Sequence, residues 1–182
     1  GYDNLPSNEN FTFPVNSFVE DKELLDYKIK LVLANNGFNE HYSNSLYSGI
    51  DCKINSKYQP IEILNPLSQD MRYLRNSLLP GLLKAVAFNE KRKHKIVKLF
   101  EIGVINRYNS KKFNKATQYK DLMITWMGEE MIHWKHSTHQ DIYTIKGEVI
   151  HLLDMLNIEN FHFKLHESNI LNLFINKEKI GY

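Results

Sequence analysis

The run IVKLFEIGVIN, from Ile96 to Asn106, limits the possible folds more than any other part of this sequence. Its residues are apolar on both alternating faces except at Lys98 and Glu101. Side chains of a strand point alternately to its two faces, so this pattern is typical of a central strand that is covered on both sides. The rest of the chain must therefore supply elements that cover both faces.

Three segments have the apolar spacing of amphipathic helices. The first begins with Ser17 and Glu20 in capping-box spacing and ends at residues 35–37. The second follows the corner SLLPG of residues 77–81, whose proline is tolerated in the first turn of a helix. The third is predicted over residues 140–157.

Short extended segments separate these helices. The polar stretch 107–121 has no periodicity and is predicted to be a long loop. The short links between strands, and the lack of regular βαβ alternation, favour an α+β fold with a mainly antiparallel sheet flanked by helices. We expect about five to seven strands and three main helices. The predicted strands outside the central run are residues 38–48, 60–64, 122–127, 161–166 and 170–176.

The chain is expected to hold one domain. Residues 1–16 contain two prolines and no helical period, so we interpret them as an extended lead-in from a preceding domain. The domain is expected to cover residues 17–182 and to be truncated at its C-terminal end, because the chain stops directly after a strand-like run. The apolar faces of its periodic segments predict six buried side chains: Leu79, Leu82, Leu83, Phe100, Ile102 and Val149.

Composition excludes several classes of protein. Hydrophobic residues make up 42% and charged residues 24% of the 182, which excludes a largely disordered chain. A net charge of +2 is too weak to predict a nucleic-acid or membrane partner, and no apolar run has the length of a bilayer span. The single cysteine, Cys52, excludes an internal disulfide, fits a reducing cytosol and is interpreted as a spectator thiol.

No motif predicts catalysis by the chain alone. His133, His136 and His139 are evenly spaced, but no carboxylate or thiolate in that stretch completes a familiar zinc set, so we predict surface histidines and no metal site. Neither GxGxxG nor GxxxxGK occurs, and neither Ser68 nor Ser77 has the context of a nucleophile. We therefore predict no catalytic residue.

The basic residues leave alternatives open. Arg72 and Arg75 precede the SLLPG corner and suit either a carboxylate or phosphate clamp, or an ordinary salt bridge to Asp70 or Glu101. The clusters Lys91–Lys95 and Lys111–Lys115 suit RNA contact. Cations at the C-terminal end of a helix, as in the first cluster, also complement the helix dipole.

The segment NPLSQDMRYLRNSLLPGLL, followed by LFEIG, closely resembles the β subunit of bacterial phenylalanyl-tRNA synthetase. Further matches are GYDNLP, NGFNE, Trp134, IKGEV and KIGY, so the resemblance covers nearly the whole chain. It implies the fold of a class II aminoacyl-tRNA synthetase core that does not form the aminoacylation site. It also implies that the corner is scaffold, formed by Asn65, Pro66, Arg75, Ser77, Pro80 and Gly81.

The resemblance further assigns two of the class II motifs. The helix from Glu20 to Asn36 and the following GFNEHYSNSL resemble motif 1, which serves subunit association. LFEIGVINRYN resembles the motif 2 strand, but Asn109 stands where a Glu normally follows the Arg, and motif 3 is absent. Arg107 is thus at most a relic of a nucleotide site, and we expect no nucleotide binding. The implied subunit-interface candidates are Leu25, Ile29, Val32, Phe38 and Tyr42.

As part of that β subunit, the chain is expected to be a non-catalytic scaffold in a cytoplasmic heterotetramer with the α subunit. The holoenzyme would use ATP and magnesium to attach phenylalanine to tRNA, while this fragment would hold no cofactor. Two alternatives stay open: an RNA-binding module that uses Lys91–Lys95, and an independent adenylate-forming enzyme.

Overall fold

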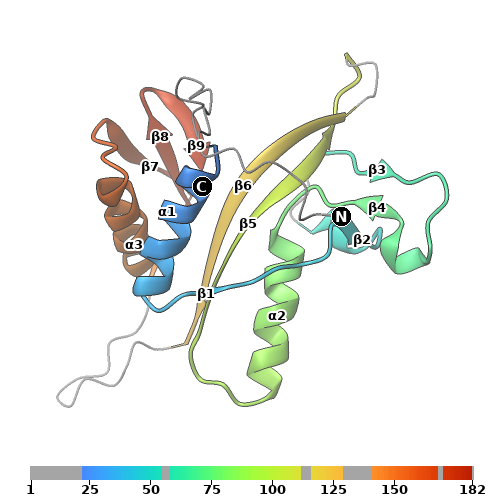
Figure 1. Cartoon of the computed structure of the whole chain (residues 1–182), viewed down its shortest axis with the longest axis horizontal. Coiled ribbons are helices and arrows are strands. Elements are labelled where there is room, and N and C mark those ends of the chain that lie inside the picture. The colour runs from blue at the N-terminus through green and yellow to red at the C-terminus, as the bar shows by residue number, and fades with distance from the viewer. Residues whose placement is uncertain (1–21, 55–57, 112–115, 129–140, 168–169, 182) are drawn as a thin grey trace, which may run out of the picture.

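The computed structural model describes residues 22–54, 58–111, 116–128, 141–167 and 170–181 (Figure 1). Its three α-helices are α1 (Lys22–Asn35), α2 (Leu79–Lys91) and α3 (Ile142–Met155). They confirm the three predicted helices, although the expected cap of the first at Ser17 and Glu20 lies outside the described residues. The side chain of Asp141 caps α3, accepting hydrogen bonds from the backbone nitrogens of Tyr143 and Thr144.

The predicted central strand is confirmed as β5 (Val97–Tyr108), which lies between β1 (Asn39–Glu40) and β6 (Ala116–Met127). The pairing of β1 with β5 is parallel, and that of β5 with β6 is antiparallel over the full length of both strands. The prediction of a loop over 107–121 was wrong, because both strands extend into it. An antiparallel ladder pairs backbone groups whatever the side chains are, so exposed polar residues leave no apolar period to detect.

Six more strands form two further sheets of three strands each. One has the order β2 (Leu46–Tyr47), β4 (Tyr73–Leu74), β3 (Ile61–Glu62), and the other is β7 (Phe161–Glu167), β8 (Ile170–Ile175), β9 (Glu178–Gly181). All pairings in these two sheets are antiparallel. The α+β class is confirmed, with three small sheets among the described residues in place of one sheet of five to seven strands.

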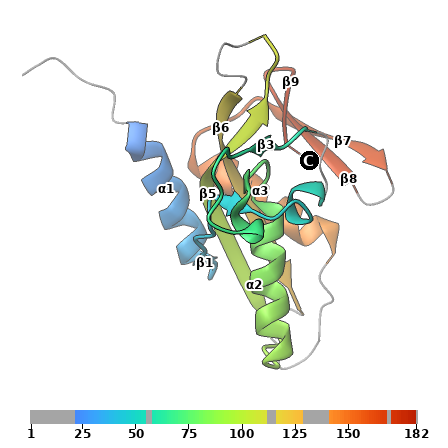
Figure 2. The same ribbon diagram turned by 90° about the vertical axis from the view of Figure 1, so that its right-hand side faces the viewer.

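The core lies on the face of β5 that α1 covers. Leu33 and Phe38 pack there against Phe100, with neighbouring β6 side chains such as Trp126 around them. The SLLPG corner and α2 lie on the opposite face of the same strand, where Leu78 approaches Gly103 (Figure 2). Both faces of the central strand are therefore covered, as its sequence predicts.

Five of the six side chains expected to be buried are fully or partly buried. Leu82 and Phe100 are fully enclosed, and Leu79, Ile102 and Val149 are partly covered. Leu83 is 44% exposed, so its predicted burial was wrong. Pro80, Gly81 and Leu82 take the inward positions of the first turn, and at about 3.6 residues per turn the next residue points outward. Within the described residues, no helix is long and apolar enough to cross a membrane.

Candidate functional site

The corner before α2 is built around a buried ion pair. Arg75 donates from its Nη1 to Glu101 Oε1 at 2.5 Å, and their side chains are 4% and 0% exposed. Arg75 Nε donates to the carbonyl of Val104 at 2.8 Å, and the Ser43 hydroxyl donates to Glu101 Oε2 at 2.7 Å. Of the roles left open by the sequence, Arg75 takes the salt bridge to Glu101. Arg72 pairs with Glu62 at the surface, so neither arginine uses Asp70.

Two glycines make room for this arrangement. A Cβ at Gly103 would collide with the Arg75 guanidinium. A Cβ at Gly81 would lie 2.6 Å from both Cβ and Oγ of Ser43, and the Gly81 nitrogen donates to the Tyr47 hydroxyl at 3.2 Å. The corner is thus a close-packed bend that orients α2 against β5.

The structure brings together only part of the predicted corner set. Ser77 accepts a hydrogen bond from the Leu79 nitrogen at 3.2 Å, and Pro80 is buried beside Gly81. Asn65 is exposed and Pro66 partly exposed, in the loop between β3 and β4. These two residues therefore lie outside the buried bend.

Arg107 lies near the end of β5, between two aromatic rings. Its guanidinium carbon is 4.2 Å from the ring centroid of Tyr58 and 4.6 Å from that of Tyr119. Its Nη2 is 3.8 Å from Asp121 Oδ2, and its Nε is buried without a hydrogen-bond partner. The tyrosine rings hold the guanidinium in place, and the carboxylate beside it partly neutralises the charge that would attract a triphosphate.

The neighbours of Arg107 also disfavour an anion. Burial raises the pKa of Asp121 above its ordinary value, although the nearby Arg107 charge opposes this shift. Asn109, which replaces the motif 2 glutamate, donates to the Thr117 hydroxyl at 3.1 Å across the hairpin. ATP does not fit this group of residues, because its arginine already has the Asp121 carboxylate 3.8 Å away, and that carboxylate would repel a triphosphate.

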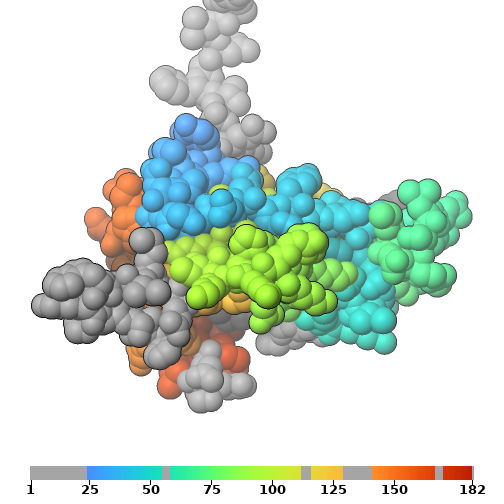
Figure 3. Space-filling model, turned by 90° about the horizontal axis from the view of Figure 1, so that it is seen from below, coloured from blue at the N-terminus to red at the C-terminus, as the bar shows by residue number. Residues whose placement is uncertain are grey.

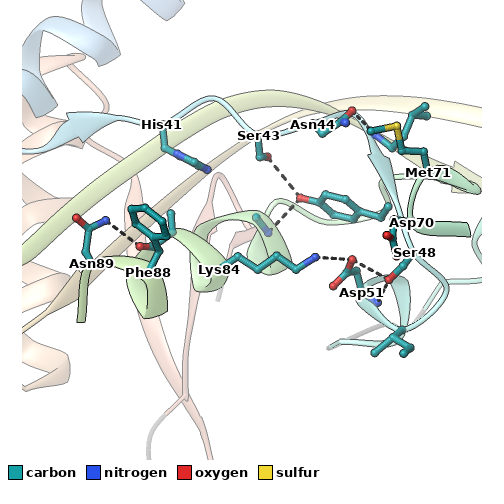
Figure 4. Close-up of a pocket in the computed structure, with 15 residues that line it drawn as sticks. His41, Ser43, Asn44, Ser48, Asp51, Asp70, Met71, Lys84, Phe88 and Asn89 are labelled. Carbon is teal, nitrogen blue, oxygen red and sulfur yellow. Dashed lines mark hydrogen bonds and ion pairs between the residues drawn. The ribbon is translucent and has the colours of Figure 1, made fainter. Parts of the chain in front are cut away.

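A groove of about 770 Å³ runs between α2 and the segment that leads from β1 to Lys53 (Figure 4). Lys84 of α2 reaches across it to Asp51 Oδ2 at 2.6 Å, and the Ser48 hydroxyl donates to the same oxygen at 2.8 Å. Burial alone would raise the pKa of Asp51, but the hydrogen bonds from Lys84 and Ser48 outweigh it and hold the pKa below its ordinary value. Asp51 is therefore a paired carboxylate at neutral pH.

Cys52, next to this carboxylate, is buried. Burial, together with the negative charge of Asp51, raises the pKa of its thiol to about 11. A thiol that stays protonated at neutral pH is a poor nucleophile.

Only part of the remaining predicted sites falls within the described residues. His133, His136 and His139 fall outside the described residues, and no group of three or more potential metal ligands occurs within the described ones. Lys91–Lys95 are all exposed at the end of α2, where Arg92 stacks over Phe88. Of the second basic cluster only Lys111 is described, and it is exposed.

The predicted interface residues divide between surface and core. Leu25 and Tyr42 are 54% and 84% exposed, whereas Ile29 packs against the core and Phe38 is buried in it. Val32 is partly buried. Sequence reasoning missed a second stripe of α1, because it assigned the helix a single apolar face. That outward stripe, at spacings i, i+3 and i+7, consists of Leu24, Tyr27 and Leu31, which are 48%, 63% and 48% exposed.

Similar folds occur among aminoacyl-tRNA synthetases. A pyrrolysyl-tRNA synthetase from Desulfitobacterium hafniense superposes with a TM-score of 0.66 at 17% sequence identity, over 86% of this chain and 53% of that one. A second structure of that enzyme gives a TM-score of 0.65. The fold is thus that of a class II-like aminoacyl-tRNA synthetase core.

Sequence comparison identifies the family within this class of fold. Residues 12–182 match the family model described as phenylalanyl tRNA synthetase beta chain CLM domain. The phenylalanine–tRNA ligase beta subunit of Staphylococcus aureus (strain USA300) is 32% identical over 100% of this chain and 24% of its own length, and that of Blochmanniella floridana is 29% identical over 85% and 21%. The chain belongs to the phenylalanyl-tRNA synthetase β-chain family and spans about a quarter of the length of these relatives.

Proposed function

We propose that this chain is an assembly domain of the β subunit of phenylalanine–tRNA ligase and performs no adenylate chemistry itself. The match over residues 12–182 to the β-chain family supports the assignment to that subunit. The observation that carries the non-catalytic role is the placement of Arg107, which packs against Tyr58 and Tyr119 and has the carboxylate of Asp121 3.8 Å from its Nη2, where it would repel a phosphate.

The holoenzyme follows from this assignment. The domain, residues 17–182 after a lead-in at 1–16, joins an α subunit in a cytoplasmic heterotetramer. The α subunit supplies the site where ATP and magnesium activate phenylalanine for transfer to tRNA. This chain contributes rigid surfaces that place its partner, and the buried Arg75–Glu101 pair fixes those surfaces relative to one another.

The outward stripe of α1 is the surface that we assign to subunit association. Three large apolar side chains on one exposed helix face are unfavourable in water and are typical of a contact between proteins. Leu25, beside the stripe, and Tyr42, beyond β1, are exposed as well. Ile29 and Phe38 support this surface from the core side.

Replacement of Leu24 and Leu31 by Asp in the full β subunit tests the proposal. Each added charge would be desolvated in the contact, so we expect association with the α subunit to weaken by about tenfold or more, measured by sedimentation. Tyr143→Asp on α3, where the side chain is 69% exposed, is the matched control. Unchanged association of the double variant would refute the role of α1.

A further inference from the structure

The most exposed large apolar side chains of the described residues come from one short part of the chain. Leu64, Leu67, Tyr42 and Ile50 are 97%, 91%, 84% and 80% exposed, and all lie within residues 42–67. Single exposed leucines are ordinary on protein surfaces, but four nearly bare side chains from one stretch are not. The outward stripe of α1 does not include any of them.

One of these side chains lines the groove beside α2, and two others lie in a loop that leads to it. Ile50 lines it, together with Met71 from the short helical turn Gln69–Met71 and Phe88 from α2. Leu64 and Leu67 belong to the loop that leads into that turn. The groove therefore has apolar side chains on separate parts of its lining, and Asp70 and Met71, at the end of the leucine loop (residues 63–71), belong to that lining.

The leucine loop is held in shape by its own hydrogen bonds. The nitrogen of Ile63 donates to the Arg72 carbonyl at 2.9 Å, and that of Met71 to the Ser68 carbonyl at 3.2 Å. The Arg72 side chain ties the base of the loop to Glu62 and Gln69. A loop fixed in this way presents its leucines without a large ordering cost, which favours binding.

The charges of the groove indicate what would complement it. Asp51 in the groove is already neutralised by Lys84, and Glu62 at the base of the leucine loop is neutralised by Arg72. Among the residues that the structure describes, Asp70 at the groove wall forms no salt bridge. An apolar segment that carries one basic residue near Asp70 would match both the apolar side chains of the groove and the negative charge of Asp70.

We propose that the groove and the leucine loop are a second contact surface for the α subunit, filled by an apolar segment of that subunit with a basic residue opposite Asp70. This inference rests on the proposed function. Figure 3 shows α1 (blue), the residues after it (light blue), α2 (green) and the projecting region around residues 60–72 (blue-green) on one side of the molecule. A single partner that contacts α1 therefore reaches the groove without turning around the domain.

Two substitutions in the full β subunit test this surface by different means. Leu64→Asp with Leu67→Asp puts charge on the loop, and Ala85→Trp fills the groove without adding charge. We expect each to weaken association with the α subunit by about tenfold or more. Leu165→Asp on β7, at a side chain that is 62% exposed, should leave association unchanged. Thermal unfolding of each isolated β subunit serves to separate lost contact from lost folding.

The outcomes separate the inference from the function on which it rests. If the Leu24 and Leu31 variant fails to assemble while the loop and groove variants associate normally, the second surface is wrong and the proposed function stands. If the unmodified β subunit does not associate with the α subunit, the proposed function itself fails. If the loop and groove variants abolish self-association of the β subunit and leave α binding intact, the occupant is a second copy and the inference is overturned.

Discussion

At the scale of single residues, the buried ion pair of Arg75 and Glu101 is expected to contribute strongly to the stability of the fold. Glu101→Ala would leave an uncompensated guanidinium in a site where its side chain is 4% exposed. Loss of one partner from a buried pair costs about 3–5 kcal/mol. We expect that loss in urea unfolding, against no more than about 1 kcal/mol for Glu62→Ala at the exposed Arg72 pair. Equal effects of the two substitutions would contradict the structural role of the buried pair.

Asp51 gives a residue-level prediction about pH. Because its pKa is lowered in the folded state, it contributes stability above the usual value of 3.8 that is lost as pH falls through the lower folded value. Lys84→Met removes the partner that lowers this pKa. The variant should therefore be less stable than the parent at neutral pH, with a difference that shrinks as pH falls below 3.8 through the lower folded pKa of Asp51.

Denaturant unfolding at several pH values measures this difference. In an Asp51→Asn background, the Lys84 substitution should produce no such pH dependence. A difference between parent and Lys84→Met that stays constant down to strongly acidic pH would show that the ion pair does not stabilise the fold.

At the scale of elements, the seating of α2 depends on Gly81. Its missing side chain lets the helix approach Ser43, so Gly81→Ala must push α2 away or distort the bend. Such overpacking costs about 1–3 kcal/mol. Gly147→Ala on α3 has open space around the new methyl group and should instead stabilise its helix by about 0.5–1 kcal/mol. The thermal unfolding temperatures of the two variants test this packing. We expect a decrease for Gly81→Ala and an increase for Gly147→Ala, and changes of the same sign would contradict it.

Sequence patterns predicted the elements that bury apolar side chains and missed those that do not. The central strand from Ile96 and the third helix were predictable because their cores impose a period. The polar end of the β5–β6 hairpin has no apolar period, so its strands could not be predicted from the sequence. For Arg75 the sequence allowed Asp70 or Glu101 as partner, since only tertiary packing brings Glu101 beside it. The groove was not predicted, because three separate segments form it.

At the scale of the whole molecule, we assign different roles to two regions. One side carries α1, the groove and the leucine loop, whose exposed apolar side chains suit contact with a partner. Near the end of β5, Arg107 packs against Tyr58 and Tyr119 beside the carboxylate of Asp121. A domain that assembles a ligase without binding its nucleotide needs the apolar contact surface. It does not need nucleotide binding at Arg107.

Calorimetric titration of ATP and magnesium into the β subunit, with and without Arg107→Ala, tests the central claim most directly. The stacked arginine, the adjacent Asp121 and the substitution of Asn109 for a glutamate predict no saturable heat at micromolar ATP in either protein. They also predict that the ATP KM of the assembled ligase is unchanged by Arg107→Ala, with any lost activity following lost assembly. Saturable binding at micromolar ATP that disappears in Arg107→Ala would contradict the account and assign a working nucleotide site to this domain.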